Sequence, residues 1–127
     1  MKKLGCILIV DDDDTSNFVT KLMLDKTDAA HIILMARNGK EAVNYLEENK
    51  NNFPDLILLD INMPIMNGFD FLEYWEKKGM TSNSKIVMFS TSIREEDKTK
   101  AEQFYDVISY IEKPLNEKKI AALFKEI

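Results

Sequence analysis

The amino-acid sequence predicts an α/β fold in which five parallel strands form one sheet with helices on both faces. Short, continuously apolar runs alternate along the chain with stretches whose apolar residues recur about every 3.6 residues. The chain has 127 residues, which allows roughly 25 residues for each strand–helix unit of a single domain. Strands that alternate with helices favour a parallel sheet with right-handed crossover connections.

Five apolar runs are the predicted strands. Each is rich in Ile, Leu and Val, and continuous apolarity rather than alternation indicates burial on both faces of a sheet. The runs are Leu4–Val10, His31–Ala36, Asp55–Leu59, Lys85–Phe89 and Val107–Ile111.

Apolar stripes at helical spacing lie between these runs and after the last one. The first stripe comprises Phe18, Val19, Leu22 and Met23, the second Ala42, Val43 and Leu46, the third Phe71, Leu72 and Trp75, and the last Ile120, Leu123, Phe124 and Ile127. The segment 94–104 is mostly charged, so we expect it to form the least tightly packed helix. Asp13 and Asp14 precede the first stripe and are expected to cap that helix.

Composition excludes several classes of function. The chain carries 17 basic and 22 acidic residues, a net charge of −5, which argues against a nucleic-acid or anionic-membrane surface. A single cysteine, Cys6, excludes an internal disulfide framework and fits a reducing compartment. We therefore expect a cytoplasmic protein with one domain over residues 1–127, no membrane-spanning segment and no output domain.

Polar side chains follow four of the five predicted strands. In the doubly wound order 2-1-3-4-5, which is flavodoxin-like, ligands bind beyond the carboxyl ends of the strands, where strand order reverses. We therefore expect three carboxylates to converge there, beside a hydroxyl and an ammonium group. The residues concerned are Asp11 and Asp12 after the first strand, Asp60 after the third, Ser90 and Thr91 after the fourth, and Lys113 and Pro114 after the fifth.

Three neighbouring carboxylates repel one another unless a cation joins them. Magnesium prefers oxygen ligands and is typically held by one or two carboxylates together with phosphate oxygens. A magnesium ion beside a carboxylate, a lysine and a hydroxyl is suited to phosphoryl transfer, in which a carboxylate can itself act as the nucleophile. The strand ends thus predict a phosphoryl-transfer site.

The sequence resembles the receiver domain of two-component response regulators over essentially its whole length. Four stretches carry this resemblance, in the expected order and spacing. They are Ile7-Leu-Ile-Val-Asp-Asp12, Leu58-Leu-Asp-Ile-Asn-Met-Pro-Ile-Met-Asn-Gly68, Val87-Met-Phe-Ser90 and Tyr110-Ile-Glu-Lys-Pro114.

The resemblance implies a role for each site residue. Asp60 corresponds to the phosphoacceptor, and Ser90 and Lys113 to the hydroxyl and ammonium groups that contact the phosphoryl group. Magnesium, or manganese in its place, would be held by Asp11, Asp12, Asp60 and the backbone carbonyl of Asn62. Tyr110 matches an aromatic residue that moves inward on activation, and Pro114 would follow a cis peptide bond from Lys113.

Thr91 departs from the family, in which the position after the switch hydroxyl is usually small. Its branched side chain is expected to narrow access to the phosphoryl site.

The same resemblance implies partners and an output. A histidine kinase or histidine phosphotransfer protein would donate the phosphoryl group, and residues near the first helix such as Asn17, Thr20 and Lys21 would select it. A downstream protein would bind the face made by the fourth helix, fifth strand and fifth helix, with no nucleic-acid or membrane partner. We expect a monomer or weak dimer that is not an enzyme beyond its own phosphorylation and dephosphorylation.

Two alternatives remain at this point. The segment Asp11–Thr15 also fits the Asp-x-Asp-x-Thr motif of haloacid-dehalogenase-like phosphatases, with Asp11 as the nucleophile and Asp13 as the general acid. That family needs a further acidic cluster after the lysine, whereas only one amphipathic stretch follows Pro114. The second alternative is a pseudo-receiver that binds partners without phosphorylation, against which the complete set of site residues argues.

Overall fold

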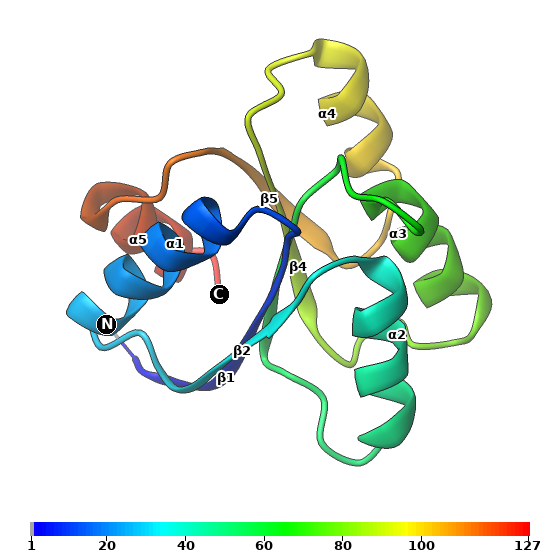
Figure 1. The fold of residues 1–127 in the computed structure, drawn as a ribbon, viewed down its shortest axis with the longest axis horizontal. Coiled ribbons are helices and arrows are strands. Elements are labelled where there is room, and N and C mark those ends of the chain that lie inside the picture. Colours follow the sequence, from blue (N-terminus) through cyan, green and yellow to red (C-terminus); the bar gives the residue numbers. More distant parts are fainter. Residues whose placement is uncertain (1) are drawn as a thin grey trace.

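The computed structural model describes residues 2–127, and in this range five strands alternate with five helices as predicted (Figure 1). In chain order the elements are β1 Leu4–Val10, α1 Asp14–Lys26, β2 Ala30–Ala36, α2 Gly39–Glu48, β3 Leu56–Leu59, α3 Gly68–Lys77, β4 Lys85–Ser90, α4 Glu95–Glu102, β5 Val107–Glu112 and α5 Glu117–Phe124. The predicted strand boundaries agree with these to within one residue.

The strands form one parallel sheet in the order β2-β1-β3-β4-β5, which confirms the predicted doubly wound, flavodoxin-like topology. Helices α1 and α5 lie on one side of the sheet and α2, α3 and α4 on the other (Figure 1). The order reverses between β1 and β3, so the carboxyl ends of these two strands flank the crevice in which such sheets bind ligands.

Each face of the sheet has its own apolar core. The core on the α2–α3 face includes Trp75, Phe71 and Leu46, and the core on the α1–α5 face includes Leu24, Ile120 and Leu123. The central strands β1, β3 and β4 contribute to both cores because alternate residues point to opposite faces. Burial on both faces explains why these strands are continuously apolar.

The predicted buried stripe of α1 is wrong for two of its four residues, whereas Val19 and Met23 are half-buried and Met23 packs against the core. Phe18 is 69% exposed and Leu22 is 51% exposed, so both face away from the core. The buried face of α1 consists instead of Asn17, Thr20 and Leu24.

A polar contact fixes this phase of α1. The Asn17 side-chain amide donates a hydrogen bond of 3.0 Å to the backbone carbonyl of Asp11. The Asp13 carboxylate caps the helix by accepting from the backbone amides of Thr15 and Ser16, as predicted. These contacts anchor the start of α1 to the end of β1 and turn Phe18 and Leu22 outward.

Strand β2 also differs from the prediction, because it is not buried on both faces. It lies at the edge of the sheet, and Ile32 and Met35 are 55% and 46% exposed. Only Ala36 of this strand is buried.

Helix α4 is weakly anchored, as its charged sequence predicts. Ala101 is its one buried residue, and Arg94, at the N-cap position before the helix, makes no side-chain capping hydrogen bond. None of the helices within residues 2–127 combines the length and apolarity needed to cross a membrane.

Candidate functional site

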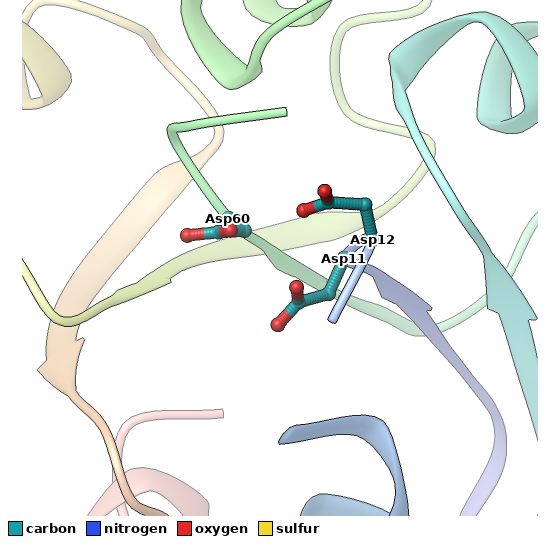
Figure 2. A group of neighbouring side chains, drawn as sticks. All are labelled: Asp11, Asp12 and Asp60. Atoms are coloured by element: carbon teal, nitrogen blue, oxygen red, sulfur yellow. The ribbon is translucent and has the colours of Figure 1, made fainter. Parts of the chain in front are cut away.

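Three carboxylates meet at the carboxyl ends of β1 and β3. One oxygen each from Asp11, Asp12 and Asp60 can be chosen so that all three lie within 4.8 Å of one another. Figure 2 shows the side chains extending from the two strand ends into a common space. The predicted convergence of these residues is therefore confirmed in the geometry.

Asp11 is the most enclosed member of the cluster, with 1% of its surface exposed. Its Oδ2 lies 2.5 Å from the Lys113 ammonium and accepts a hydrogen bond of 3.1 Å from the Ser16 hydroxyl. Its Oδ1 accepts from the backbone amide of Asp13 at 3.0 Å. These partners hold the Asp11 carboxylate in one orientation.

Asp60 directly follows β3, and close packing of the chain fixes its position. A Cβ atom on Gly68 would lie 2.3 Å from the Asp60 carbonyl oxygen, so only glycine allows α3 to begin this near to the strand end. The Gly68 amide donates to the carbonyl of Ile61, and the Ile61 amide donates to Asp60 Oδ1 at 2.9 Å.

The environment of Asp60 opposes its ionisation. Burial raises the pKa of the Asp60 carboxyl from 3.8 to about 6, because the charged form loses hydration. The Lys113 ammonium, 3.7 Å away, lowers this pKa, whereas the nearby Asp11 and Asp12 carboxylates raise it further.

The charges around the site fit a divalent cation. Three ionised carboxylates face one ammonium group, which leaves two negative charges uncompensated in a half-enclosed space. A small, hard cation with oxygen ligands would balance them and favour the ionised form of Asp60.

Lys113, which follows β5, contacts Asp11 and Asp60, and Ser90 ends the neighbouring strand β4. The Lys113 backbone amide donates to the Ser90 carbonyl at 2.9 Å, which brings the ends of the two strands together. The peptide bond between Lys113 and Pro114 is cis, as predicted.

The chain matches the model of the response regulator receiver domain over residues 7–125. It is 33% identical to protein PilH of Pseudomonas aeruginosa over 114 residues, which cover 90% of this chain and 89% of PilH. A two-component response regulator from Cytophaga hutchinsonii has a similar structure, with a TM-score of 0.91, 29% identity, and coverage of 98% of this chain and 97% of the other.

This chain belongs to the response regulator receiver family. The Mn(2+)-bound form of response regulator Rcp1 is also similar, with a TM-score of 0.76 and 26% identity over 94% of this chain and 88% of that one. Receiver domains are signalling switches of two-component systems, so family membership removes the phosphatase alternative based on Asp11 and Asp13.

The receiver site includes Ser92, which sequence reasoning missed. The Ser92 amide donates to the Ser90 hydroxyl at 3.1 Å, and its carbonyl accepts from the Tyr110 hydroxyl at 3.0 Å. Its own hydroxyl donates to Asp97 of α4 at 2.7 Å. Ser92 thus links both predicted switch residues to α4, and no motif in the sequence indicates this.

Arg37, in the loop between β2 and α2, was missed as well. Its guanidinium pairs with the Asp14 carboxylate and donates at 3.1 Å to the Asp12 backbone carbonyl. The receiver loop that carries Asp12 is therefore held from β2 as well as from β1. The residues lie 25 positions apart, so local sequence patterns cannot reveal the contact.

Two further predicted residues lie at the rim of the receiver site. Asn62 and Thr91 are both exposed and line a cavity of about 610 Å³ between the β3–α3 loop and the start of α4. Thr91 also lines a second cavity of about 300 Å³, between α1 and the loop after β5. Its position between the two cavities is compatible with the predicted effect on access.

The prediction that Asn17, Thr20 and Lys21 form a recognition surface is wrong for two of the three residues. Asn17 and Thr20 are 6% and 2% exposed, because they form the buried face of α1. The accessible residues on this helix include Phe18 and Leu22.

Proposed function

We propose that this receiver is a phosphorylation-driven switch in which Asp60 accepts a phosphoryl group from a histidine kinase or a histidine phosphotransfer protein. The observation that carries the proposal is the convergence of Asp11, Asp12 and Asp60 with the Lys113 ammonium at the switch point of the sheet. This set of groups provides a nucleophile, a divalent-cation site and a fixed positive charge.

Asp11, Asp12 and Asp60 would hold magnesium, with the backbone carbonyl of Asn62 as a further ligand. The uncompensated charge of the cluster supports this assignment, as does the manganese-bound state of the similar regulator Rcp1. The cation would neutralise phosphoryl oxygens and lower the pKa of Asp60.

The transfer needs no general base, because Asp60 is already mostly ionised at neutral pH with a pKa of about 6. A carboxylate oxygen of Asp60 forms a bond to phosphorus while the bond from phosphorus to the donor imidazole nitrogen breaks. The electron pair of that bond stays on the imidazole, and the product is an acyl phosphate. Lys113 would compensate the charge on the phosphoryl oxygens.

Ser90 and Tyr110 would transmit the change to the surface. The Ser90 hydroxyl now accepts from the Ser92 amide, and a phosphoryl oxygen on Asp60 would draw the Ser90 hydroxyl toward itself as a donor. Since the Ser92 carbonyl accepts from Tyr110, the rearranged loop would reposition Tyr110 and α4. The face formed by α4, β5 and α5 would then bind a downstream protein, or the phosphoryl group would pass onward in a relay.

The donor protein would dock beside α1. Phe18 and Leu22 are exposed on this helix, and a mostly apolar cavity separates α1 from Pro114 and Leu115 near the phosphoacceptor. An exposed apolar surface rimmed by polar groups is typical of a protein-binding site.

Intact-mass measurement after incubation with a small-molecule phosphodonor tests the proposal. With magnesium, the wild-type protein should gain one phosphoryl group that survives acid and is lost in mild base. Omission of magnesium, or the substitution Asp60→Asn, should abolish the gain. Wild-type protein that stays unmodified would instead support the pseudo-receiver alternative.

A further inference from the structure

The loop between β5 and α5 carries Lys113, whose ammonium group belongs to the receiver site. This loop spans residues 113–116 (Figure 1). The Lys113 ammonium contacts the Asp11 carboxylate and lies 3.7 Å from the Asp60 carboxylate. Because the ammonium of a lysine is carried on a flexible four-carbon stem, its position depends on how firmly the backbone below it is held.

The peptide unit between Glu112 and Lys113 is held at both ends. Its N–H donates a hydrogen bond of 2.9 Å to the Ser90 carbonyl. Its C=O, which belongs to Glu112, accepts a hydrogen bond of 2.7 Å from the Lys119 ammonium. The N–H and C=O of a trans peptide unit point in opposite directions within one plane. The two hydrogen bonds therefore fix the orientation of this plane and the direction in which the Lys113 side chain leaves it.

Lys119 also binds the carbonyl of the residue that follows Lys113. Its ammonium donates to the Pro114 carbonyl at 2.9 Å. Pro114 has no backbone N–H of its own with which to hold the loop. Hydrogen bonds from a charged donor are stronger than those between neutral groups. One residue of α5 thus binds the carbonyls of both sequence neighbours of Lys113.

Lys119 occupies a helix position that is unfavourable for a cation. It is the third residue of α5, and its backbone amide donates at 2.8 Å to the side chain of the N-cap residue Asn116. The first turn of a helix favours acidic side chains, such as Glu117 in this turn, because the helix dipole is positive there. The half-buried Lys119 side chain bends back to the loop carbonyls instead. Departures from local preference are typical of residues that serve a functional site.

We propose that Lys119 is a positioning residue for phosphoryl transfer, because it holds the backbone from which the Lys113 ammonium reaches Asp11 and Asp60. The inference rests on the proposed function, in which Lys113 compensates charge on the phosphoryl oxygens. A charge that is already in place when the phosphoryl group arrives costs no reorganisation during the reaction. Without the Lys119 ammonium, water replaces it at the two carbonyls, and the backbone at Lys113 is free to turn.

The rate of phosphorylation by acetyl phosphate in the presence of magnesium, followed by intact mass, tests the inference. Lys119→Met keeps an unbranched side chain but removes the ammonium, and it should slow phosphorylation by about three- to tenfold. Lys119→Arg should react within about twofold of the wild-type rate, because a guanidinium can donate to both carbonyls. Lys118→Met is the matched control, since Lys118 is exposed in the same turn of α5, and it should react at the wild-type rate.

The NMR signal of the Lys113 ammonium provides a second measurement, which needs no phosphorylation. The signal is assigned in isotope-labelled protein by its loss in Lys113→Met. It should shift or broaden in Lys119→Met and stay unchanged in Lys119→Arg and Lys118→Met. Lys119→Gln, which is shorter and uncharged, should behave as Lys119→Met does, and it replaces that variant in both measurements if the methionine variant does not fold.

A wild-type rate of phosphorylation in Lys119→Met would overturn the inference. So would a slower rate with an unchanged Lys113 signal, because the effect would then not act through Lys113. Wild-type protein that is never phosphorylated would refute the proposed function instead. In that case the Lys113 signal still shows whether Lys119 positions this ammonium.

Discussion

At the scale of single residues, Asp60 is held in a position that disfavours its own charge. Its pKa rises from 3.8 to about 6 because the carboxyl is buried near Asp11 and Asp12. Between these pH values the folded protein keeps a proton that the unfolded chain has lost. The free energy of unfolding therefore falls as the pH rises from about 4 to 6. Above pH 6 the loss of stability that comes from ionising Asp60 is complete.

Asp60→Asn should remove this loss of stability, because asparagine carries no charge. Without magnesium at pH 7 to 8, we expect the variant to be more stable than the wild type by on the order of 2 kcal/mol. Urea denaturation across the pH range measures the difference, which should disappear below pH 4. Magnesium should stabilise the wild type more than the variant. A variant that is less stable than the wild type at pH 7 would contradict burial as the origin of the raised pKa of Asp60.

Ile65 adopts a backbone conformation that is unfavourable for a branched side chain. It has a φ of 70° and stands at the centre of a γ-turn closed by the Met66 amide and the Pro64 carbonyl at 2.7 Å. Its side chain is 82% exposed, so packing contributes little at this position.

Ile65→Gly should therefore stabilise the protein by about 1 kcal/mol, measured by denaturant unfolding. Ile93→Gly is the matched control: Ile93 is an isoleucine in the β4–α4 loop, is 63% exposed and has no positive φ. We expect that variant to lose stability, because glycine adds only chain entropy to the unfolded state. Equal effects of the two substitutions would refute the role of backbone strain.

Thr91 is expected to slow the loss of the phosphoryl group. It lines both cavities that flank the site, and we expect its branched side chain to restrict the approach of water to Asp60. Phosphorylated Thr91→Ala should lose its phosphoryl group faster than the wild type, as followed by intact mass over time. Ile93→Ala, in the same loop and with a 63% exposed side chain, is the control and should decay at the wild-type rate. Identical decay rates of Thr91→Ala and the wild type would refute the prediction.

The acidic residues, Lys113 and Ser90 could be predicted because each follows a strand, and topology brings strand ends together. Arg37 and Ser92 could not, since their roles depend on tertiary contacts with Asp12 and Asp97. The residue type at the end of a strand can be read from the sequence. The contacts of Arg37 and Ser92 depend instead on the tertiary packing of loops that are distant in sequence.

At the scale of secondary-structure elements, α3 is placed by Gly68. A methyl group there would meet the Asp60 carbonyl oxygen at 2.3 Å, and backbone cannot yield as a flexible side chain can. Gly68→Ala should cost roughly 1–3 kcal/mol of stability, as measured by thermal unfolding, and should slow phosphorylation because Asp60 is displaced. Gly5→Ala is the control: its nearest contact is the Asp55 side chain at 3.0 Å, so its effect should be smaller.

Helix α1 shows the limit of periodicity as a guide to burial. The existence and extent of the helix were predictable from its stripe and its aspartate cap, but its rotation was not. Burial of Asn17 depends on a hydrogen bond to the Asp11 carbonyl, and this bond turns Phe18 outward. A pattern rule assigns apolar residues to the core and cannot anticipate a polar residue that is satisfied there.

At the scale of the whole molecule, the strand order could be predicted because few topologies satisfy the connection rules for alternating strands and helices. The exposure of β2 follows from its edge position. The fold brings strand ends that are far apart in sequence into one site. Asp11 and Lys113, for example, are in contact although 102 positions separate them.

The most direct test of Asp60 as the phosphoacceptor is to locate the phosphoryl group on the chain. Reduction of the phosphorylated protein with borohydride converts an aspartyl phosphate to homoserine, which peptide mass spectrometry assigns to a position. We predict conversion at Asp60 alone, and only when phosphorylation was carried out with magnesium. Conversion at Asp11, Asp12 or Asp13, or phosphorylated protein without any homoserine, would contradict the assignment of Asp60.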